Sequence, residues 1–217
     1  MKITVSARKS PLSKAQVEET LLEIRKYHPD IYFESIFIDT TGDLDLQTSL
    51  RNLDKTNFFT KELDELLLEG KCQIAVHSAK DLPDPLLKGL KIAAITKGLD
   101  SRDVLVLRKG ETLRSLKKGA IIALSSKKRK EAIRALREDL SFQDIRGPIH
   151  TRLKVLDSKK ADGVVIAEAA LIRLKLTHLN RIYLTGETTP LQGQLAILTQ
   201  DANMEMLKLF SCLDSRN

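Results

Sequence analysis

Four chemically active side chains follow one apolar run within five residues. In IAVHSAKDLPD (74–84), three apolar residues lead directly into His77, Ser78, Lys80 and Asp81, and two prolines then stop regular structure. A short apolar run that ends at turn residues is typical of a buried strand. Such a strand would hold an ammonium and a carboxylate side by side at its end.

Basic and hydroxyl side chains gather at three other points where a predicted strand ends. They are Arg8 and Ser10 after the first strand, Ser125, Ser126, Lys128 and Arg129 after AIIAL (120–124), and Arg146, His150 and Arg152 in DIRGPIHTRL (144–153). Ligands in open α/β sheets bind at the carboxyl ends of strands. Because guanidinium and ammonium groups recognise carboxylates and phosphates, and serines that open a helix add backbone donors, the pattern predicts a ligand with several negative groups.

Each of these residues also has a structural interpretation, which the residues alone leave open. The serines could serve only as helix N-caps, and KKRK (127–130) could be a solvated basic face. Arg146 and Arg152 could form surface ion pairs, and a histidine such as His77 is more often structural than catalytic. Metal-ligand spacing is not found, and neither are the GxGxxG, GxxxxGK[ST] and GxSxG motifs, so metal, nucleotide and hydrolase functions find no support.

The composition excludes several classes of protein. The 217 residues are 42% hydrophobic and 30% charged, which suits one large or two small globular domains. No apolar run approaches the ~20 residues of a membrane span, and the N-terminus has no hydrophobic signal region. Two cysteines, Cys72 and Cys212, do not make a disulfide framework, so we expect a cytoplasmic protein.

The charge balance is basic, with 36 lysines and arginines against 29 aspartates and glutamates. A net charge of +7 suits nucleic acid, an acidic membrane surface or a polyanionic small ligand. Aromatic residues make up only 4% of the chain, which leaves few platforms for stacking single-stranded nucleic acid. The basic residues also cluster at strand ends and not along one helix. We therefore expect a small-molecule polycarboxylate as partner, no nucleic acid, no membrane, and a monomeric protein.

Apolar periodicity predicts strands that alternate with helices along the chain. Strands are expected at 2–7, 31–38, 72–76, 90–96, 103–108, 120–126, 163–167, 181–185 and 195–199, and helices at 10–28, 58–70, 127–139, 150–158, after 167 and at 201–213. This alternation favours an α/β class with largely parallel sheets.

The motifs, taken in order, resemble those of the porphobilinogen deaminase family, also called hydroxymethylbilane synthases. ARKSPLSKAQ (7–16) looks like the family's R-x-S-x-L-x-x-x-Q, AVHSAKDLP (75–83) its H-S-x-K-D-x-P, SSKKR (125–129) its S-S-x-R-R, and IRGPIHTRLKVLD (145–157) its R-G-N-x-x-T-R-x-x-K-L. TTGD (40–43), FTKELDELLLEG (59–70), DSRDVLV (100–106), AEAALIRL (167–174) and PLQGQLAI (190–197) are similar to further blocks. Nine blocks in order cover nearly the whole chain.

The resemblance implies a transferase of tetrapyrrole and haem biosynthesis that joins four porphobilinogens head to tail with loss of ammonia. It implies that Asp81 is the catalytic carboxylate, which stabilises the cationic azafulvene formed as the amine leaves. It implies that cofactor and substrate carboxylates are bound by Arg8, Ser10, Lys80, Ser126, Lys128, Arg129, Arg146 and Arg152, with His77, Ser78 and Gln194 in support. The alternative is a non-catalytic binder of an anionic small molecule or tetrapyrrole, for which a carboxylate such as Asp81 is not needed.

The chain departs from the family pattern at several positions. Leu124 replaces a threonine, Lys128 an arginine and Pro148 an asparagine, and G-Q-G has become Gly193–Gln194–Leu195. An ammonium cannot reproduce the two-pronged grip of a guanidinium, so weaker ligand binding is expected at Lys128.

The family's third domain carries the cysteine that holds a dipyrromethane cofactor by a thioether, and we expect that domain to be absent from this chain. Cys72 is expected at the far end of its strand from Asp81, and Cys212 on a packed apolar helix face. We therefore expect the dipyrromethane cofactor of the family but no covalent attachment at Cys72 or Cys212, and a minimal or impaired enzyme.

Together these observations predict a two-lobed α/β fold in the style of periplasmic binding proteins. We expect mixed, mostly parallel sheets and a cleft between the lobes. Lobe one is expected at 1–98 plus 190–217, and lobe two at 99–189, with chain crossings near 96–103 and 186–194.

Overall fold

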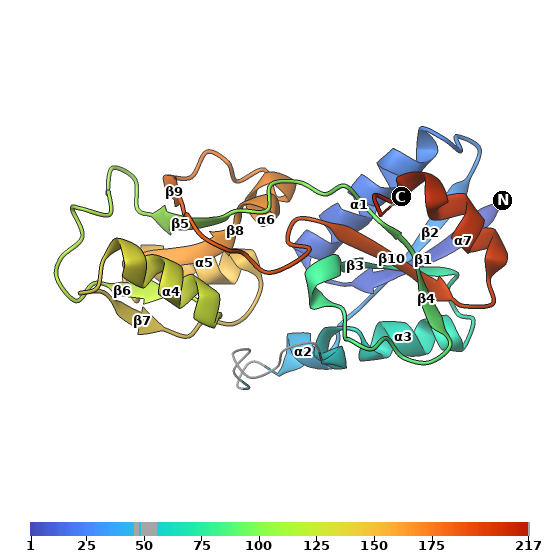
Figure 1. Ribbon diagram of the computed structural model, residues 1–217, viewed down its shortest axis with the longest axis horizontal. Coiled ribbons are helices and arrows are strands. Elements are labelled where there is room, and N and C mark those ends of the chain that lie inside the picture. The colour runs from blue at the N-terminus through green and yellow to red at the C-terminus, as the bar shows by residue number, and fades with distance from the viewer. Residues whose placement is uncertain (46–47, 49–55, 217) are drawn as a thin grey trace. The chain divides into compact units, whose positions relative to one another are not determined.

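The computed structural model of the protein describes residues 1–45, 48 and 56–216, and it shows two compact units (Figure 1). Unit 1 comprises Met1–Asp45, Lys55–Leu99 and Gly193–Asn217, and unit 2 comprises Leu46–Asp54 and Asp100–Gln192. The chain therefore leaves unit 1 after Leu99 and returns to it at Gly193. Within the described ranges, each unit has its own five-stranded sheet.

Unit 1 is a mixed sheet with strand order β2-β1-β3-β10-β4. Its strands are β1 (Lys2–Arg8), β2 (Tyr32–Ile38), β3 (Ile74–Ser78), β4 (Leu90–Ile95) and β10 (Leu195–Gln200). Its helices are α1 (Pro11–Arg25), α2 (Thr41–Leu44), α3 (Lys61–Leu68) and α7 (Met204–Phe210), with short 3-10 turns η2 (Asn57–Phe59), η3 (Ala79–Asp81) and η4 (Ser211–Leu213). β1 pairs in parallel with β2 and β3, whereas β10 is antiparallel to β3 and β4.

Alternating strand residues build two apolar layers on the two faces of this sheet. Ile3 and Val5 of β1 pack in one cluster with Phe210 of α7. Ala75 of β3 belongs to the other cluster, together with Leu63 and Leu67 of α3. The sheet is therefore covered on both faces, and the polar ends of β1 and β3 emerge from a buried core.

Unit 2 is a second mixed sheet, with strand order β7-β6-β8-β5-β9. Its strands are β5 (Asp103–Leu107), β6 (Ile121–Ala123), β7 (Ser141–Gln143), β8 (Gly163–Ala167) and β9 (Arg181–Tyr183), and its helices are α4 (Lys127–Leu136), α5 (Ile149–Asp157) and α6 (Glu168–Arg173). β6 is parallel to β7 and β8, whereas β5 is antiparallel to β8 and β9. Leu105, Ile122 and Val165 of three strands pack with Ile133 of α4.

The predicted α/β class with two lobes and mixed sheets is confirmed, but parallel pairs do not predominate. Among the described strands, each sheet has two parallel and two antiparallel pairings, because β10 enters between β3 and β4 against their direction, and β5 lies between β8 and β9 in the same way. β7 was not expected, since three residues with one half-buried side chain give no apolar period. No helix in the described ranges is long and apolar enough to cross a membrane.

Candidate functional site

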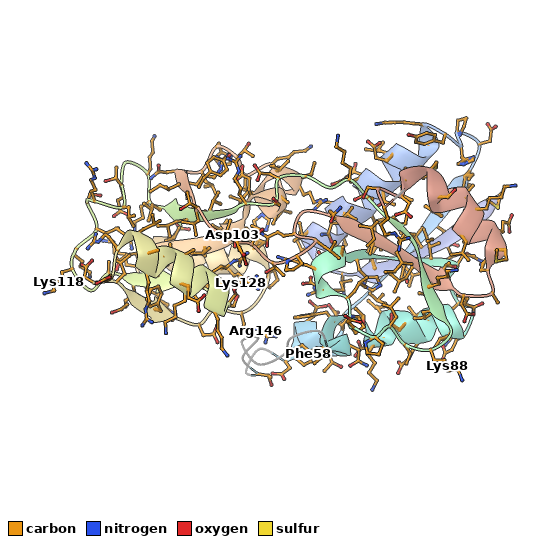
Figure 2. All side chains as sticks on the ribbon, in the orientation of Figure 1. Phe58, Lys88, Asp103, Lys118, Lys128 and Arg146 are labelled. Carbon is orange, nitrogen blue, oxygen red and sulfur yellow. The ribbon has the colours of Figure 1, made fainter. Side chains whose placement is uncertain are left out.

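The predicted site residues fall into two groups, one in each unit. The first lies where β1 and β3 of unit 1 end, and the second lies around α4 and α5 of unit 2. Figure 2 labels Lys128 and Arg146 of the second group, and also Asp103, the ion-pair partner of Arg129.

Asp81 and Lys80 lie on η3, directly after the central strand β3. The first four residues of β3 are buried, and the backbone N–H of Ala79 donates to the carbonyl of Gln194 at 3.0 Å, which anchors the start of the turn. Both charged side chains are half-buried. Among the residues that the structure describes, no side chain forms an ion pair with the Asp81 carboxylate. In the described part of the chain, no cation therefore neutralises the Asp81 carboxylate.

Gln194, predicted to support the site, contacts η3 through its backbone. Its carbonyl accepts from Ala79, while its side-chain amide donates to the carbonyl of Thr96 at 3.0 Å and to the hydroxyl of Ser215 at 3.4 Å. The side chain therefore ties the segment after β4 to the C-terminal segment, and the main chain holds η3.

Arg8, predicted to bind a ligand, is paired with a carboxylate of its own unit. Its Nε donates to Oδ2 of Asp43 at 3.0 Å, its Nη2 pairs with Oδ1, and the ring of Phe59 lies 4.4 Å from the guanidinium carbon. Burial raises the pKa of Asp43, but hydrogen bonds and charge from Arg8, together with hydrogen bonds from Thr40, outweigh burial and lower the pKa below its usual value.

Asp43 was not among the predicted site residues, although the TTGD block that contains it was recognised. The block has a steric requirement as well, because a Cβ on Gly42 would overlap the ring of Phe59. Glycine is needed here for the close approach of the aromatic ring. Gly42 thereby allows Phe59 to pack onto Arg8.

Ser10 and Ser78 are engaged in structural hydrogen bonds within unit 1. Ser10 caps α1, since its hydroxyl accepts from the backbone N–H of Ser13 at 3.2 Å. The hydroxyl of Ser78 accepts from Nε2 of the buried Gln16 at 2.8 Å. Gln16 closes the R-x-S-x-L-x-x-x-Q motif, but it was not predicted to be a site residue.

His77 is a buried, neutral histidine. It is 4% exposed, and burial together with the charge of Arg8 lowers its pKa to about 4. Its Nε2 has no hydrogen-bond partner among the described residues. An imidazole with this pKa carries no charge at neutral pH, so it contributes no positive charge to an anion site.

The start of α4 holds part of the second group, namely Ser126, Lys128 and Arg129. Ser126 caps the helix and accepts from the backbone N–H of Arg129 at 3.3 Å. Arg129 turns inward, where its Nη2 donates to Oδ1 of Asp103 at 2.7 Å. Lys128 turns outward, with Nζ 3.5 Å from the carbonyl of Thr188 and 3.6 Å from the exposed carboxylate of Glu187. Two neighbouring cations of one helix thus have different environments.

Arg146 and Arg152 lie before and within α5, and each donates to neutral oxygens. Arg152 donates to the carbonyl of Gly147 at 2.7 Å and to the hydroxyl of Ser125 at 3.3 Å, while Arg146 donates to the carbonyl of Thr48. Both side chains are half-buried, and His150 of the same cluster is exposed.

The two cysteines differ in exposure, and one prediction about them is wrong. Cys72 is 3% exposed, its Sγ donates to the hydroxyl of Ser6 at 3.2 Å, and burial raises its pKa. Cys212 does not pack on a helix face but is exposed. α7 ends at Phe210, and the following 3-10 turn changes the side-chain period that the prediction assumed. Partial burial still raises the pKa of the Cys212 thiol.

The chain matches the family described as "Porphobilinogen deaminase, dipyromethane cofactor binding domain" over residues 3–208. It belongs to the porphobilinogen deaminase family. A probable porphobilinogen deaminase of Chlamydia muridarum is 38% identical over 208 residues, which cover 96% of this chain and 85% of that protein. The porphobilinogen deaminase of Clostridioides difficile is 40% identical over 201 residues, which cover 91% and 67%.

Solved structures with similar folds are far more distant in sequence. A periplasmic substrate-binding protein of an ABC transporter from Coxiella burnetii gives a TM-score of 0.58 at 13% identity, covering 97% of this chain and 91% of that one. CbnR, a LysR family transcriptional regulator, gives 0.59 at 11% identity, covering 96% and 67%. Likeness at this identity shows the fold alone, and it confirms the predicted periplasmic-binding-protein style.

Family membership raises the question of whether the residues present fit a dipyrromethane cofactor, whose side chains carry carboxylates. The donor set of unit 2 fits, because the half-exposed ammonium of Lys128 has two oxygens at 3.5 and 3.6 Å, longer than strong charge-assisted hydrogen bonds. Lys128, Arg146 and Arg152 are the residues that would hold the cofactor's carboxylates. In the described part of the chain, no group of three or more side chains could hold a metal ion.

Proposed function

We propose that this chain acts as a porphobilinogen deaminase, which condenses porphobilinogen into a linear tetrapyrrole with release of ammonia. The observation that carries the proposal is the position of Asp81, half-buried on η3 beside Lys80 and without an ion-pair partner in the described ranges. A protein that only binds carboxylates has no use for a fixed carboxylate, which would repel them. A reaction that passes through a cation does.

Asp81 acts on the charge that develops when the amine leaves the substrate. Loss of ammonia converts the pyrrole into an azafulvene cation, whose charge is shared by the ring nitrogen and the methylene carbon. That carbon then bonds to the free α-carbon of the next pyrrole, which loses its proton. A carboxylate held by a buried strand stabilises the cation without having to reorganise, and its partial burial strengthens the interaction.

The charge of the units supports binding of a polycarboxylate in unit 2. Its sequence ranges contain 21 lysines and arginines against 12 aspartates and glutamates, a net +9, so the chain's total of +7 leaves unit 1 at −2. Each porphobilinogen brings an acetate and a propionate. We assign these carboxylates to Lys128, Arg146 and Arg152 of unit 2. Arg8 and Arg129 support the site from within, because each pairs with a largely buried carboxylate, whereas Glu187, the partner of Lys128, is exposed.

The decisive experiment is incubation of the purified protein with porphobilinogen. Disappearance of the substrate and formation of linear tetrapyrrole, or of the uroporphyrin derived from it, is the expected result. Calorimetric titration of the same sample measures binding separately. A protein that binds porphobilinogen but converts none of it over several hours is a binder, and that result would overturn the proposed activity.

A further inference from the structure

A buried ion pair joins α4 to the segment where the chain enters unit 2. Nη2 of Arg129 lies 2.7 Å from Oδ1 of Asp103, and the two side chains are 11% and 10% exposed. Nη1 of the same guanidinium donates to the carbonyl of Val165 on β8, at 3.5 Å. Arg129 therefore bridges β5 and β8 from the first turn of the helix, and it does not reach out toward a ligand.

Gln192 completes this cluster from the segment where the chain leaves unit 2. The side chain is 3% exposed, and its Nε2 donates to Oδ1 of Asp103 at 3.0 Å and to the carbonyl of Ser101 at 2.8 Å. Asp103 and Gln192 are 89 residues apart in the sequence. Oδ1 of Asp103, in the entry segment, thus accepts hydrogen bonds from a guanidinium of α4 and from an amide of the exit segment.

The cluster of Asp103, Arg129 and Gln192 adjoins Ser126 and Lys128, which are predicted ligand groups. Ser126 accepts from the backbone N–H of Arg129, and Lys128 lies between them in the sequence. With Arg129 held inward and Ser126 capping the helix, the backbone of Lys128 is fixed on both sides. The outward direction of the Lys128 ammonium follows from the inward anchoring of its neighbour.

Stability does not require a cluster of this kind. A buried ion pair often contributes no more to stability than apolar residues of similar size, because both charges lose their hydration. A cluster of this kind instead defines one geometry, since each hydrogen bond has a preferred distance and direction.

We propose that Asp103 and Gln192 are positioning residues, which hold the first turn of α4 against the entry and exit segments of unit 2. In that position Lys128 and Ser126 meet a carboxylate of the bound pyrrole. This inference rests on the proposed function for the identity of the ligand, but the anchoring itself concerns only residues of unit 2. Gln192 is needed as an amide, because a glutamate there would place a second carboxylate beside Asp103.

The test compares two glutamines whose amides both donate to backbone carbonyls. Gln192→Met removes the donor beside Asp103, and Gln200→Met is the matched control, since Nε2 of Gln200 donates to the carbonyls of Leu67 and Leu68 in unit 1 at 2.7 and 3.2 Å. Gln192→His, which keeps an N–H donor, is the conservative variant. Porphobilinogen is the probe, measured by calorimetry and by steady-state kinetics.

Gln192→Met should raise the Kd and KM for porphobilinogen about tenfold while kcat changes little, because a lost anchor loosens ligand binding and leaves Asp81 in place. Gln200→Met should leave both constants unchanged, and Gln192→His should restore most of the affinity. Equal constants for Gln192→Met and the wild type would overturn the inference, as would equal losses in the two methionine variants.

Hydrogen–deuterium exchange gives a readout that needs no ligand. Amides of the first turn of α4 and of residues 189–192 should exchange faster in Gln192→Met than in the wild type, and at the wild-type rate in Gln200→Met. Unchanged exchange in Gln192→Met would overturn the positioning role. A wild-type protein that does not bind porphobilinogen would instead overturn the proposed function, so the two failures are distinguishable.

Discussion

At the residue scale, unit 1 holds two buried titratable side chains whose pKa values are shifted in opposite directions. Burial raises the pKa of Asp64 to about 6, a hydrogen bond from Thr60 opposes this, and nearby Glu65 and Glu62 add to it. Burial and the charge of Arg8 lower the pKa of His77 to about 4. Both groups are therefore least stable in their charged forms, and each makes the free energy of unfolding depend on pH between about 4 and 6.5.

The first prediction concerns Asp64. Its folded pKa lies above the unfolded value, so the folded protein binds more protons between about pH 4 and 6 and loses stability as the pH rises through that window. An asparagine at this position has no charge to bury. When the pH rises from about 4 to about 7, the unfolding free energy of Asp64→Asn should therefore increase by about 2 kcal/mol relative to that of the wild type. Urea unfolding at both pH values measures this shift, and a difference that does not change with pH would contradict it.

The second prediction concerns His77, where the sign is reversed. The folded pKa lies below the unfolded value, so the folded protein binds fewer protons and loses stability as the pH falls from 6.5 toward 4. When the pH falls from about 7 to about 4, the unfolding free energy of His77→Gln should therefore increase by about 2 to 3 kcal/mol relative to that of the wild type. Because the two effects oppose each other, the wild type should show a flatter pH profile than either variant. A wild-type profile steeper than both would refute this account.

The third prediction concerns Asp81. Asp81→Asn keeps the size of the side chain and removes the charge, so the fold and the Kd for porphobilinogen should persist while kcat falls at least about 100-fold. The thermal midpoint, the calorimetric Kd and kcat together separate the three properties. Asp84→Asn is the matched control, because Asp84 is an exposed carboxylate three residues further along the same segment. An unchanged kcat in Asp81→Asn would contradict the proposed role of the carboxylate.

At the scale of elements, the first turn of α4 shows how one helix can present two cations for different purposes. Arg129 faces Asp103 in a nearly buried pair, whereas Lys128 is 47% exposed and its partner Glu187 is 92% exposed. An exposed pair of that kind contributes little to stability. Removing one partner of a buried pair leaves an uncompensated charge, which is strongly destabilising.

The fourth prediction follows from this contrast. Arg129→Met should lower the unfolding free energy by about 3 kcal/mol, because Asp103 is left buried without its cation. Lys128→Met should leave stability nearly unchanged and weaken porphobilinogen binding by about 1 to 3 kcal/mol. Denaturant unfolding and calorimetry on both variants measure the two quantities. If Arg129→Met instead weakens binding without lowering stability, Arg129 is itself a ligand residue.

At the scale of the whole molecule, Cys72 and Cys212 are the two thiols that these 217 residues offer to a dipyrromethane cofactor. The thiol of Cys72 lies before β3, at the opposite end of that strand from Asp81, and it is buried against Ser6. Cys212 is exposed, but its pKa is raised, so little of the reactive thiolate is present at neutral pH. Neither thiol is well suited to forming a thioether.

The fifth prediction is that the purified chain carries no covalent dipyrromethane. Intact-mass spectrometry should give the mass of the unmodified chain. An adduct of dipyrromethane size that disappears in Cys212→Ser but persists in Cys72→Ser would show that the exposed cysteine is the attachment point. The prediction would then be wrong, although the carboxylate contacts in unit 2 would be unaffected.

The sequence by itself determined the elements and the chemical character of the site. The apolar run before Asp81 appears as the buried strand β3, the Ser10–Pro11 pair begins α1, and the ordered motifs identified the family. These features are local, because hydrophobic period, capping and motif spacing involve residues close together in the chain. These features therefore form with little dependence on residues that are distant in the sequence.

Only the tertiary structure decided which charges are paired and which face outward. Arg8 meets Asp43 across 35 residues, Arg129 meets Asp103 across 26, and Gln192 reaches Asp103 across 89. Such pairings depend on strand order and direction, and the antiparallel insertion of β10 and β5 shows that neither follows from local pattern. A cation's role as ligand group or internal anchor is set by the burial and the partner that the folded chain supplies, because burying an unpaired charge is too costly to persist.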